Sequence, residues 1–517
     1  MTHPYATQLF DLFKHLGPEM TLIVFACVLF VAGLFRADRA AWSLLAVAGI
    51  LAAFFVLAIS PRPQVLSGDS VFAVPLVFDA LGNFTRVLAL STGIILVLLA
   101  WDEVPERHVA DHHACLLVII AGVNLVGCSN DLVTLFLALE MISIPTYILL
   151  YLPKHDDAAQ EAAIKYFLLS VFSSAILLFG FSYLFGLTGT TNIAAILQTL
   201  HNAEEIKASQ GLAQIAMLTI AAGLGFRITA VPFHFYAPDV FQGTSTSGAA
   251  FLSFVPKVAG FIAILRVFGF VLPAGVTTPA ERSLVGLGLS DQVPILFWFL
   301  AALTMTIGNL LALLQDNLKR LIAYSGIAHA GYMLIAVASA PYLSGPDSAT
   351  SGVAAVLFYL VAYGTMTLGV LALVLMLHRD ERPVENIDDL AGLAQSHPYL
   401  AILTTALLLS LIGFPLTMGF TGKFLIFFGA MAAQGPTHLW LYPTLAVIGV
   451  VNAAIGAWYY LRIIAVMYLR ASVKPIETPG TITCLIALLV CVIFTVALSV
   501  PPGASWLMNV ARQAAVR

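Results

Sequence analysis

The sequence predicts an all-α polytopic membrane protein with about 14 transmembrane helices, and three observations support this prediction. Of the 517 residues, 60% are hydrophobic and only 10% are charged, whereas about 25% of residues are charged in soluble globular domains. The mean hydropathy is +0.96, and a single soluble domain has too little interior to bury so much apolar surface. The apolar residues form long continuous runs, which favour helices over the short alternating strands of a membrane β-barrel.

Fourteen apolar runs are long enough to cross about 30 Å of hydrocarbon as helices. In chain order they cover residues 20–35, 40–60, 77–100, 112–129, 131–152, 160–186, 213–234, 244–271, 292–315, 320–340, 352–378, 399–432, 441–470 and 480–500. The first run is short, so its helix is expected to begin within the polar segment before it. That segment lacks the basic-then-apolar layout of a signal peptide, so the first span is expected to be retained.

The distribution of Lys and Arg predicts the orientation of these spans. An even number of spans places both termini on the same side of the bilayer. The loops on one side hold ten basic residues, whereas the loops and termini on the other side hold six. Because basic loops stay in the cytoplasm, the set of ten is predicted to be cytoplasmic and both termini to face outward.

The composition also excludes several classes of protein. The net charge is −4, and no basic run could follow a phosphate backbone, so no nucleic-acid partner is expected. The five cysteines lie in apolar runs and form no C-x-x-C pair, which argues against an iron–sulfur cluster or a zinc site. The chain has neither a Walker loop nor a dinucleotide fingerprint. We therefore expect no cofactor or metal in this chain, and the lipid bilayer as its surroundings.

Charged residues inside the predicted spans are the best candidates for function. A charge at the bilayer centre costs about 2.5–3.5 kcal/mol on insertion scales, so it usually marks an ion or proton path or an internal ion pair. Glu140, Lys257 and Lys423 lie at or past the middle of their runs, and Arg227 lies two-thirds along its run. We interpret these four residues as parts of a path through the membrane.

Each of these four residues lies near a proline in the same run, namely Pro145, Pro232, Pro256 or Pro415. Proline has no N–H group, so the carbonyl four residues earlier loses its helical partner. Because lipid offers no hydrogen bonds, that carbonyl needs water, a side chain or another helix. Interrupted helices with buried charge are typical of hydrated sites near the middle of a membrane. The segment GFPLTMGFTGK around Pro415 is the clearest example.

Three further residues are weaker candidates for the same path. Lys165 lies near the cytoplasmic end of its run, where its side chain can equally extend to the lipid headgroups. His329 is in the middle of its run, and His234 lies at the end of another. An imidazole titrates near neutral pH and suits a proton relay, although a structural role fits His329 nearly as well.

Four other charges are weaker candidates, of which Arg266 and Arg462 are expected to be structural, whereas an Asp79–Arg86 pair fits a functional or a structural role equally. Arg266 and Arg462 lie near the ends of their runs, from which their side chains can reach the headgroups. Asp79 and Arg86 are seven residues apart, so they share a helix face and can form an internal ion pair.

Six segments resemble the antiporter-like membrane subunits of respiratory complex I, specifically the NADH-quinone oxidoreductase subunit N family. They are LALEMISIPTYILLYL, AAIKYFLLSVFSSAILLFG, AVPFHFYAPDVFQG, FLSFVPKVAGF, TIGNLLALLQDNLKRLIAYSGIAHAGYML and GFPLTMGFTGKFLIF. The resemblance extends from about residue 75 to residue 470. Any one segment alone would also fit the sister subunits and the multi-subunit cation/proton antiporters. A subunit of such an antiporter, without redox partners, is therefore the alternative function.

The resemblance implies an organisation of the chain. Helices 1–3 would occupy residues 1–111. Helices 4–8 and 9–13 would form two inverted five-helix repeats in residues 112–271 and 292–470, with helices 7 and 12 broken. Helix 14 and the tail would occupy residues 471–517.

The resemblance also implies a function, in which this chain is a proton-translocating subunit of NADH:quinone oxidoreductase in a bacterial inner membrane, with periplasmic termini. Glu140, Lys257 and Lys423 match the family's fifth-span glutamate, eighth-span lysine and twelfth-span lysine. The partners would be the other complex I subunits, including neighbouring antiporter-like subunits. NADH, FMN, the iron–sulfur clusters and quinone would bind in those other subunits.

The chain departs from the family at Arg227, where the seventh span usually carries a lysine. A lysine in an apolar environment can release its proton, because burial disfavours the charged form. Arginine stays protonated in proteins. Arg227 can therefore hold Glu140 ionised but cannot load and release a proton. Either the relay bypasses Arg227 through water, His234 or Lys257, or this half of the protein has lost its pumping role. A further alternative is that the whole chain is an inert scaffold within the complex, but the retained Glu140, Lys257 and Lys423 argue against it.

Overall fold

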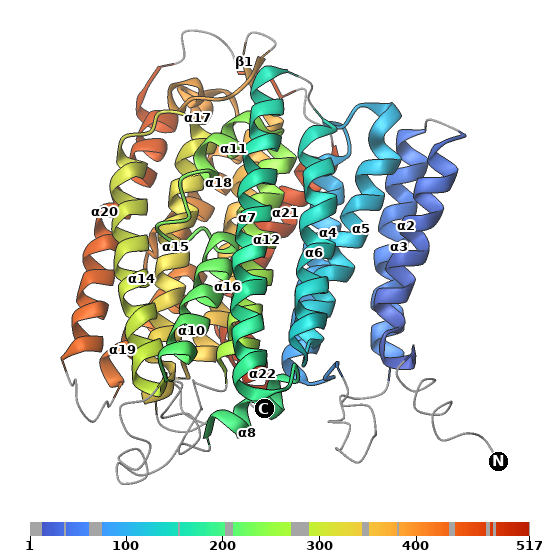
Figure 1. The fold of residues 1–517 in the computed structure, drawn as a ribbon. Helices are drawn as coiled ribbons and strands as arrows, with labels where there is room; N and C mark the ends of the chain where they lie inside the picture. The colour runs from blue at the N-terminus through green and yellow to red at the C-terminus, as the bar shows by residue number, and fades with distance from the viewer. Residues whose placement is uncertain are drawn as a thin grey trace.

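The computed structural model describes residues 13–35, 38–60, 75–153, 156–201, 210–269, 289–343, 351–379, 382–433, 440–471, 476–478 and 482–515. In these residues the chain forms a bundle of mostly parallel and antiparallel helices (Figure 1). Ten of the helices are long and apolar enough to cross a membrane, and five shorter helices are also apolar. The chain is therefore a polytopic all-α membrane protein, as its composition predicts.

Each of the fourteen predicted runs contains a helix. The first half of the bundle consists of α2 (Gly17–Gly33), α3 (Arg39–Ile59), α4 (Ala80–Ala100), α5 (Val109–Cys128), α6 (Leu132–Tyr151), α7 (Asp157–Thr188), α8 (Ile193–His201), α10 (Gln210–Arg227), α11 (Ala237–Gly243) and α12 (Thr246–Phe268). The second half consists of α14 (Leu289–Leu313), α15 (Leu318–Ser339), α16 (Gly352–Met376), α17 (Leu393–Ser396), α18 (Pro398–Ile412), α19 (Met418–Ala432), α20 (Leu441–Leu469), α21 (Ile482–Ala497) and α22 (Gly503–Ala515). The number of membrane crossings, the inverted repeats and the division into four segments stay predictions.

Short elements connect the helices. The 3-10 turns are η1 (Glu106–His108), η3 (Ala340–Tyr342) and η4 (Ile387–Leu390). Strands β1 (His378–Arg379) and β2 (Arg382–Pro383) pair antiparallel, with His378 opposite Pro383. Strand β1, helix α11 and helix α17 lie at the same end of the bundle, which we call the β1 end (Figure 1).

Two of the predicted spans are interrupted, and two continue through their prolines. Helix α10 ends at Arg227, and α11 begins only at Ala237. Helix α18 ends at Ile412, and α19 begins at Met418. By contrast, α6 and α12 run without a break through Pro145 and Pro256. A proline near a buried charge is thus compatible with both geometries in this chain.

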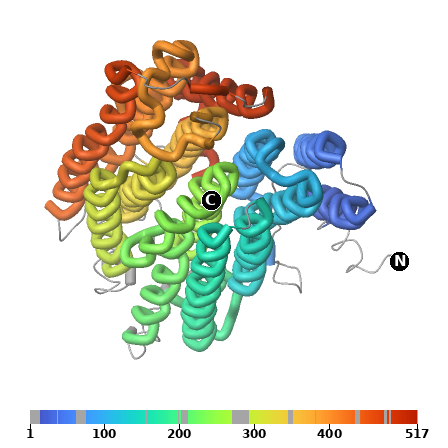
Figure 2. Tube along the Cα trace, turned by 90° about the horizontal axis from the view of Figure 1, so that it is seen from above, coloured from blue at the N-terminus to red at the C-terminus, as the bar shows by residue number. Residues whose placement is uncertain are grey.

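Helix α12 is the centre of the bundle. All 23 of its residues are buried, and it packs against α4, α5, α6, α10, α15 and α16. In the view from above, the helices before α12 and those after it occupy neighbouring sectors, with α2 and α3 at one edge (Figure 2). Large apolar side chains cover the outer faces of the peripheral helices, for example Phe55 on α3 and Trp458 on α20. Such an outer surface requires lipid as its solvent.

Candidate functional site

Glu140 and Arg227 form an ion pair in the first half of the bundle. The guanidinium of Arg227 donates a hydrogen bond of 3.3 Å to Oε1 of Glu140, and the hydroxyl of Ser174 donates one of 2.6 Å to the same oxygen. The Arg227 side chain is 6% exposed and that of Glu140 is 21% exposed. Arg227 also packs against Gly260 of α12. A Cβ added to Gly260 would lie 3.3 Å from the Cβ of Arg227. Gly260 lies three residues after Lys257 on the same helix.

The break after Arg227 is stabilised by side chains that satisfy its backbone. The hydroxyl of Thr229 donates to the carbonyl of Ile228 at 2.6 Å, and this is the carbonyl that Pro232 deprives of its helical partner. The hydroxyl of Tyr236 donates to the carbonyl of Phe226 at 3.0 Å. The N–H of Val231 donates to the hydroxyl of Thr304 on α14 at 3.1 Å. In a membrane such bonds replace those that an unbroken helix would make within itself.

Lys257 is buried without a carboxylate partner. Its side chain is 1% exposed, and it forms no ion pair in the described part of the chain. Its ammonium donates to the carbonyl of Ser253 at 3.2 Å and lies 5.8 Å above the ring of Tyr363. Gly326 of α15 approaches both groups, because an added Cβ there would lie 2.6 Å from the Tyr363 hydroxyl and 3.1 Å from Nζ of Lys257.

His329 lies at the centre of a cluster of tyrosines. Its Nδ1 is 2.7 Å from the Tyr359 hydroxyl, and its Nε2 is 3.1 Å from the Tyr460 hydroxyl. The Tyr460 hydroxyl also bonds to that of Ser325. The imidazole centroid is 5.1 Å from the ring of Tyr363. Because one nitrogen of a neutral imidazole donates and the other accepts, His329 can pass a proton between the two hydroxyls it bridges.

Lys423 fills the break between α18 and α19. Its ammonium donates to the carbonyls of Leu411 and Ile412 at 2.9 and 2.8 Å. The Leu411 carbonyl is the one that Pro415 leaves without a helical partner, so the buried cation and the interrupted helix stabilise each other. Gly413 turns the chain there with φ +87°, and Lys423 lies against it. The Lys423 ammonium is 5.1 Å from the ring of Tyr332.

Two tyrosine rings connect the two lysines through His329. Tyr363 contacts Lys257 on one side and His329 on the other. Tyr332 lies 5.6 Å from His329, ring to ring, and also faces Lys423. We call this continuous series, Lys257–Tyr363–His329–Tyr332–Lys423, the central array. It is buried and comes from helices α12, α15, α16 and α19.

Two of the weaker candidates lie outside the central array. Lys165 is half exposed and pairs with Glu161 at 2.6 Å and with Asp239 of α11 at 2.9 Å. Asp239 also binds Arg320 at 2.7 Å, so Lys165 belongs to a surface ion cluster at the β1 end. His234 is half buried in the break after α10, and its Nδ1 has no hydrogen-bond partner among the described residues.

The structural charges pair differently from the sequence prediction. Asp79 and Arg86 were expected to pair with each other, and this is wrong. Arg86 binds Glu19 of α2 at 2.8 Å, and Asp79 binds Arg266 of α12 at 2.6 Å. In each observed pair the arginine binds a carboxylate outside its own helix, rather than one along the same helix.

The position expected for Arg266 is also corrected. Arg266 is buried and bonds to the Gly127 carbonyl as well as to Asp79. Arg462 pairs with Asp316. Arg266 therefore does not extend to the headgroups, whereas Arg462 is 36% exposed and its contact with the headgroups stays a prediction.

Several residues of the site escaped the sequence analysis. Ser174 binds Glu140, and Tyr332, Tyr359, Tyr363 and Tyr460 surround His329. One signal was available for Tyr332, which lies three residues after His329 and therefore on the same helix face. The other tyrosines reach the histidine from separate helices, and their spacing along the chain does not reveal this.

Comparisons with known proteins identify the class. The family model described as NADH:quinone oxidoreductase/Mrp antiporter, transmembrane, matches residues 129–455. A chain of respiratory complex I from Thermus thermophilus has 27% sequence identity and a TM-score of 0.74, covering 94% of this chain and 97% of that one. A chain of the Mrp complex from Dietzia sp. has 20% identity, covers 98% and 97% of the two chains, and gives a TM-score of 0.74, which shows a shared fold. The protein is therefore one of the antiporter-like membrane subunits.

Curated relatives narrow this class. The NADH-quinone oxidoreductase subunit N 1 of Solibacter usitatus is 37% identical, covering 86% of this chain and 85% of its own length. Subunit N of a Geobacillus species is 34% identical, with coverage of 95% and 96%. This chain belongs to the NADH-quinone oxidoreductase subunit N family.

Proposed function

We propose that this chain is the proton-translocating subunit N of an NADH:quinone oxidoreductase, coupling electron transfer elsewhere in the complex to proton movement through its central array. The observation that supports this most directly is the burial of two lysines, Lys257 and Lys423, on either side of His329, neither of which forms an ion pair among the described residues. Unused buried charges only cost stability. A role in proton transfer explains why the chain keeps these two buried lysines despite their cost in stability.

Proton transfer would proceed in steps between these groups. A proton taken up from the cytoplasm reaches Lys257, passes by way of His329, and leaves outward from Lys423. The Glu140–Arg227 pair controls the cycle, because a change in the distance between its charges alters the field at Lys257. A conformational or electrostatic signal from quinone reduction elsewhere would drive that change. Lys165 and His234 would assist uptake at most, since neither contacts the central array.

The surroundings of the chain follow from the same proposal. It would lie in a bacterial inner membrane with both termini periplasmic, beside other antiporter-like subunits of the complex. NADH, FMN, the iron–sulfur clusters and quinone would bind in other subunits. Its four parts would be residues 1–111, the repeats 112–271 and 292–470, and residues 471–517.

Copurification tests this function. The tagged chain would be isolated from its own membranes in mild detergent, its partners identified by mass, and NADH-driven quinone reduction assayed. We expect flavin and iron–sulfur subunits together with that activity. Recovery with hydrophobic antiporter-type subunits alone, without redox activity, would contradict the proposal and favour a cation/proton antiporter. Sodium flux would then be the next assay.

Replacing Gly326 by Ala is expected to lower the proton yield per NADH. The new methyl group would lie within 3.1 Å of both Lys257 Nζ and the Tyr363 hydroxyl, so it must push the two groups apart. Alanine also favours a helix over glycine by about 0.5–1 kcal/mol, so assembly should be preserved. The measurement is NADH-driven proton transport in proteoliposomes. Gly186→Ala on α7 is the control, because nothing lies within 4 Å of its added Cβ.

Replacing Arg227 by Lys tests whether arginine limits proton transfer in the first half. If the relay bypasses this position, Arg227→Lys leaves the proton yield per NADH unchanged, since the positive partner of Glu140 is retained. A higher yield would show that arginine blocks a route that lysine opens. Loss of coupling would instead indicate that the shorter lysine does not reach the Glu140 carboxylate. The experiment uses the same proteoliposome assay.

A further inference from the structure

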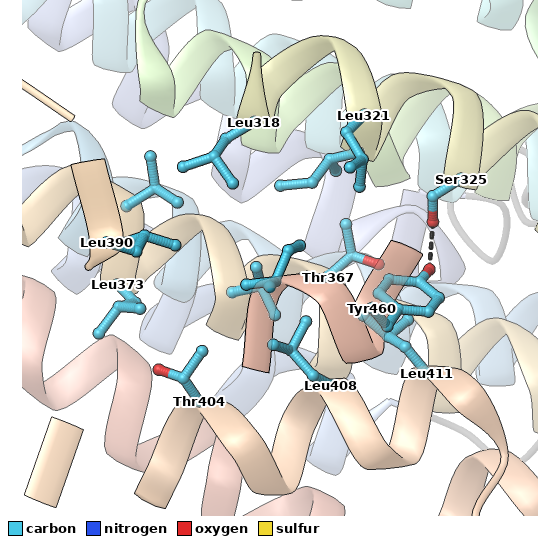
Figure 3. A pocket seen from close by; sticks show the side chains of 14 residues that line it. Leu318, Leu321, Ser325, Thr367, Leu373, Leu390, Thr404, Leu408, Leu411 and Tyr460 are labelled. Atoms are coloured by element: carbon cyan, nitrogen blue, oxygen red, sulfur yellow. Dashed lines mark hydrogen bonds between the residues drawn. The ribbon is translucent and has the colours of Figure 1, made fainter. Parts of the chain in front are cut away.

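A small cavity, with room for about one water molecule, lies between the β1 end of the second half and the central array. It is lined by residues of α15, α16, α18, α20 and η4. Leu390 and Leu373 lie at one end of the cavity, and Ser325 and Tyr460 lie at the other (Figure 3). Leu390 belongs to η4, and Leu318, which also lines the cavity, is the first residue of α15. Lys319 and Arg320 of α15, Arg379 of β1 and Arg382 of β2 are among the ten basic residues predicted to be cytoplasmic.

The inner end of the cavity is one hydrogen bond away from His329. Ser325 and Tyr460 line the cavity and bond to each other through their hydroxyls (Figure 3). The Tyr460 hydroxyl in turn lies 3.1 Å from Nε2 of His329. A proton that reaches Ser325 can therefore pass to the imidazole through one tyrosine. Each hydroxyl accepts one proton and releases another, so no charge remains on it.

A second pair of hydroxyls, those of Thr367 and Tyr363, lies between the cavity and Lys257, and the two interact with each other across one turn of α16. Thr367 lines the cavity and is 3% exposed. Tyr363 comes one turn earlier on α16 and belongs to the central array. Thr367 is therefore the polar group of the cavity on the side of Lys257, because the ring of Tyr363 next to it faces that lysine.

We propose that this cavity is a proton inlet of the second half, which loads His329 and Lys257 from the cytoplasm without passing the Glu140–Arg227 pair. The inference rests on the proposed function and explains how an arginine at position 227 is compatible with pumping. Most of the lining is Leu, Ile and Val. Because apolar constrictions open and close to ions by wetting and drying, water would fill the inlet only in part of the cycle.

Two substitutions test the inlet in the intact complex. Leu408→Phe places a larger, aromatic side chain in the cavity, and Thr367→Val removes the hydroxyl beside Tyr363 at nearly constant volume. In proteoliposomes we expect Leu408→Phe to lower the proton yield per NADH as much as Lys257→Ala does, and Thr367→Val to lower it partially. Ile402→Phe is the matched control on α18, because Ile402 is 59% exposed and does not line the cavity. Its proton yield should equal that of the unmodified chain.

The outcomes separate the inlet from the proposed function. If Lys257→Ala and Lys423→Ala lose proton yield while both cavity variants retain it, the inlet is wrong and the proposed function stands. If none of the four variants changes the yield, the proposed function fails and the inlet with it. If Leu408→Phe prevents assembly of the complex, the test rests on Thr367→Val alone. An unchanged proton yield of Thr367→Val would then contradict the inlet.

Chemical labelling gives a readout that does not depend on activity. Thr404 lines the cavity, whereas Ile402 on the same helix is exposed on the apolar outer surface of the bundle. In inside-out membrane vesicles, a Thr404→Cys variant should react with a charged, membrane-impermeant thiol reagent during turnover, and an Ile402→Cys variant should not. The unmodified chain provides the background from its own five cysteines. Equal labelling of both variants, or none of Thr404→Cys, would contradict a water-filled inlet.

Discussion

Lys257→Ala is expected to uncouple electron transfer from proton movement. The variant keeps the fold of α12 but removes the ammonium that faces Tyr363, so no group on this helix can load a proton. NADH oxidation with an artificial electron acceptor should continue at the normal rate, because that chemistry takes place in other subunits. NADH-driven proton transport in proteoliposomes should fall well below that of the unmodified complex. Lys423→Ala should behave in the same way, because Lys423 would be the exit group.

A matched substitution controls for loss of a cation from a span. Arg462 also lies in a predicted span, but it is partly exposed and pairs with Asp316 near the surface. Arg462→Ala should therefore leave the proton yield unchanged. Normal proton yield in both lysine variants would rule out the central array as the path.

Arg86→Ala is expected to cause the largest loss of stability. The side chains of Arg86 and Glu19 are 4% and 5% exposed, and Arg86 also donates to the carbonyl of His15 at 2.9 Å. Removing one partner of a buried ion pair costs about 3–5 kcal/mol, because the other charge stays buried and uncompensated. The midpoint of thermal unfolding in detergent should fall, and less assembled complex should be recovered.

A double substitution distinguishes the pair from a general packing defect. Glu19→Ala combined with Arg86→Ala removes both charges, so it should be more stable than Arg86→Ala alone. Arg470→Ala is the control, because Arg470 and Asp388 form an exposed pair of a kind that contributes about 0–1 kcal/mol. If the double variant were no more stable than the single one, the loss would not come from an unpaired Glu19.

The sequence predicted most reliably those properties that depend on where a residue lies along a single helix, such as helix position and burial depth. The length of each apolar run set the helices, and the depth of Lys257 and Lys423 in their runs indicated burial. For Pro415, proline chemistry also indicated that the Leu411 carbonyl would need a new partner, which is Lys423. The same reasoning did not separate breaks from continuous helices, because α12 passes through Pro256 unbroken. Whether a helix breaks at a proline depends on the neighbouring helices, because these supply or withhold partners for the freed backbone carbonyl.

The sequence did not predict which side chains pair between different helices. Hydropathy gives the depth of a side chain in the membrane but not the neighbour it meets across the helix surface. Arg86 therefore looked like a partner for Asp79 on its own helix, whereas it binds Glu19, which lies 67 residues away in sequence. The tyrosines around His329 were missed for the same reason, since Tyr359 and Tyr460 come from different helices.

By itself, the sequence determined that this protein lies in lipid, that it is helical, and that charged residues of the proton-carrying types are buried near the middle of its spans. These properties follow from the local cost of placing apolar or charged groups in one solvent or another. Only the tertiary structure decided which charges neutralise each other, that tyrosines link Lys257 to Lys423 through His329, and that a cavity reaches Ser325. Those properties depend on how helices far apart in the chain pack, because contacts of a few ångströms arise only when their faces meet.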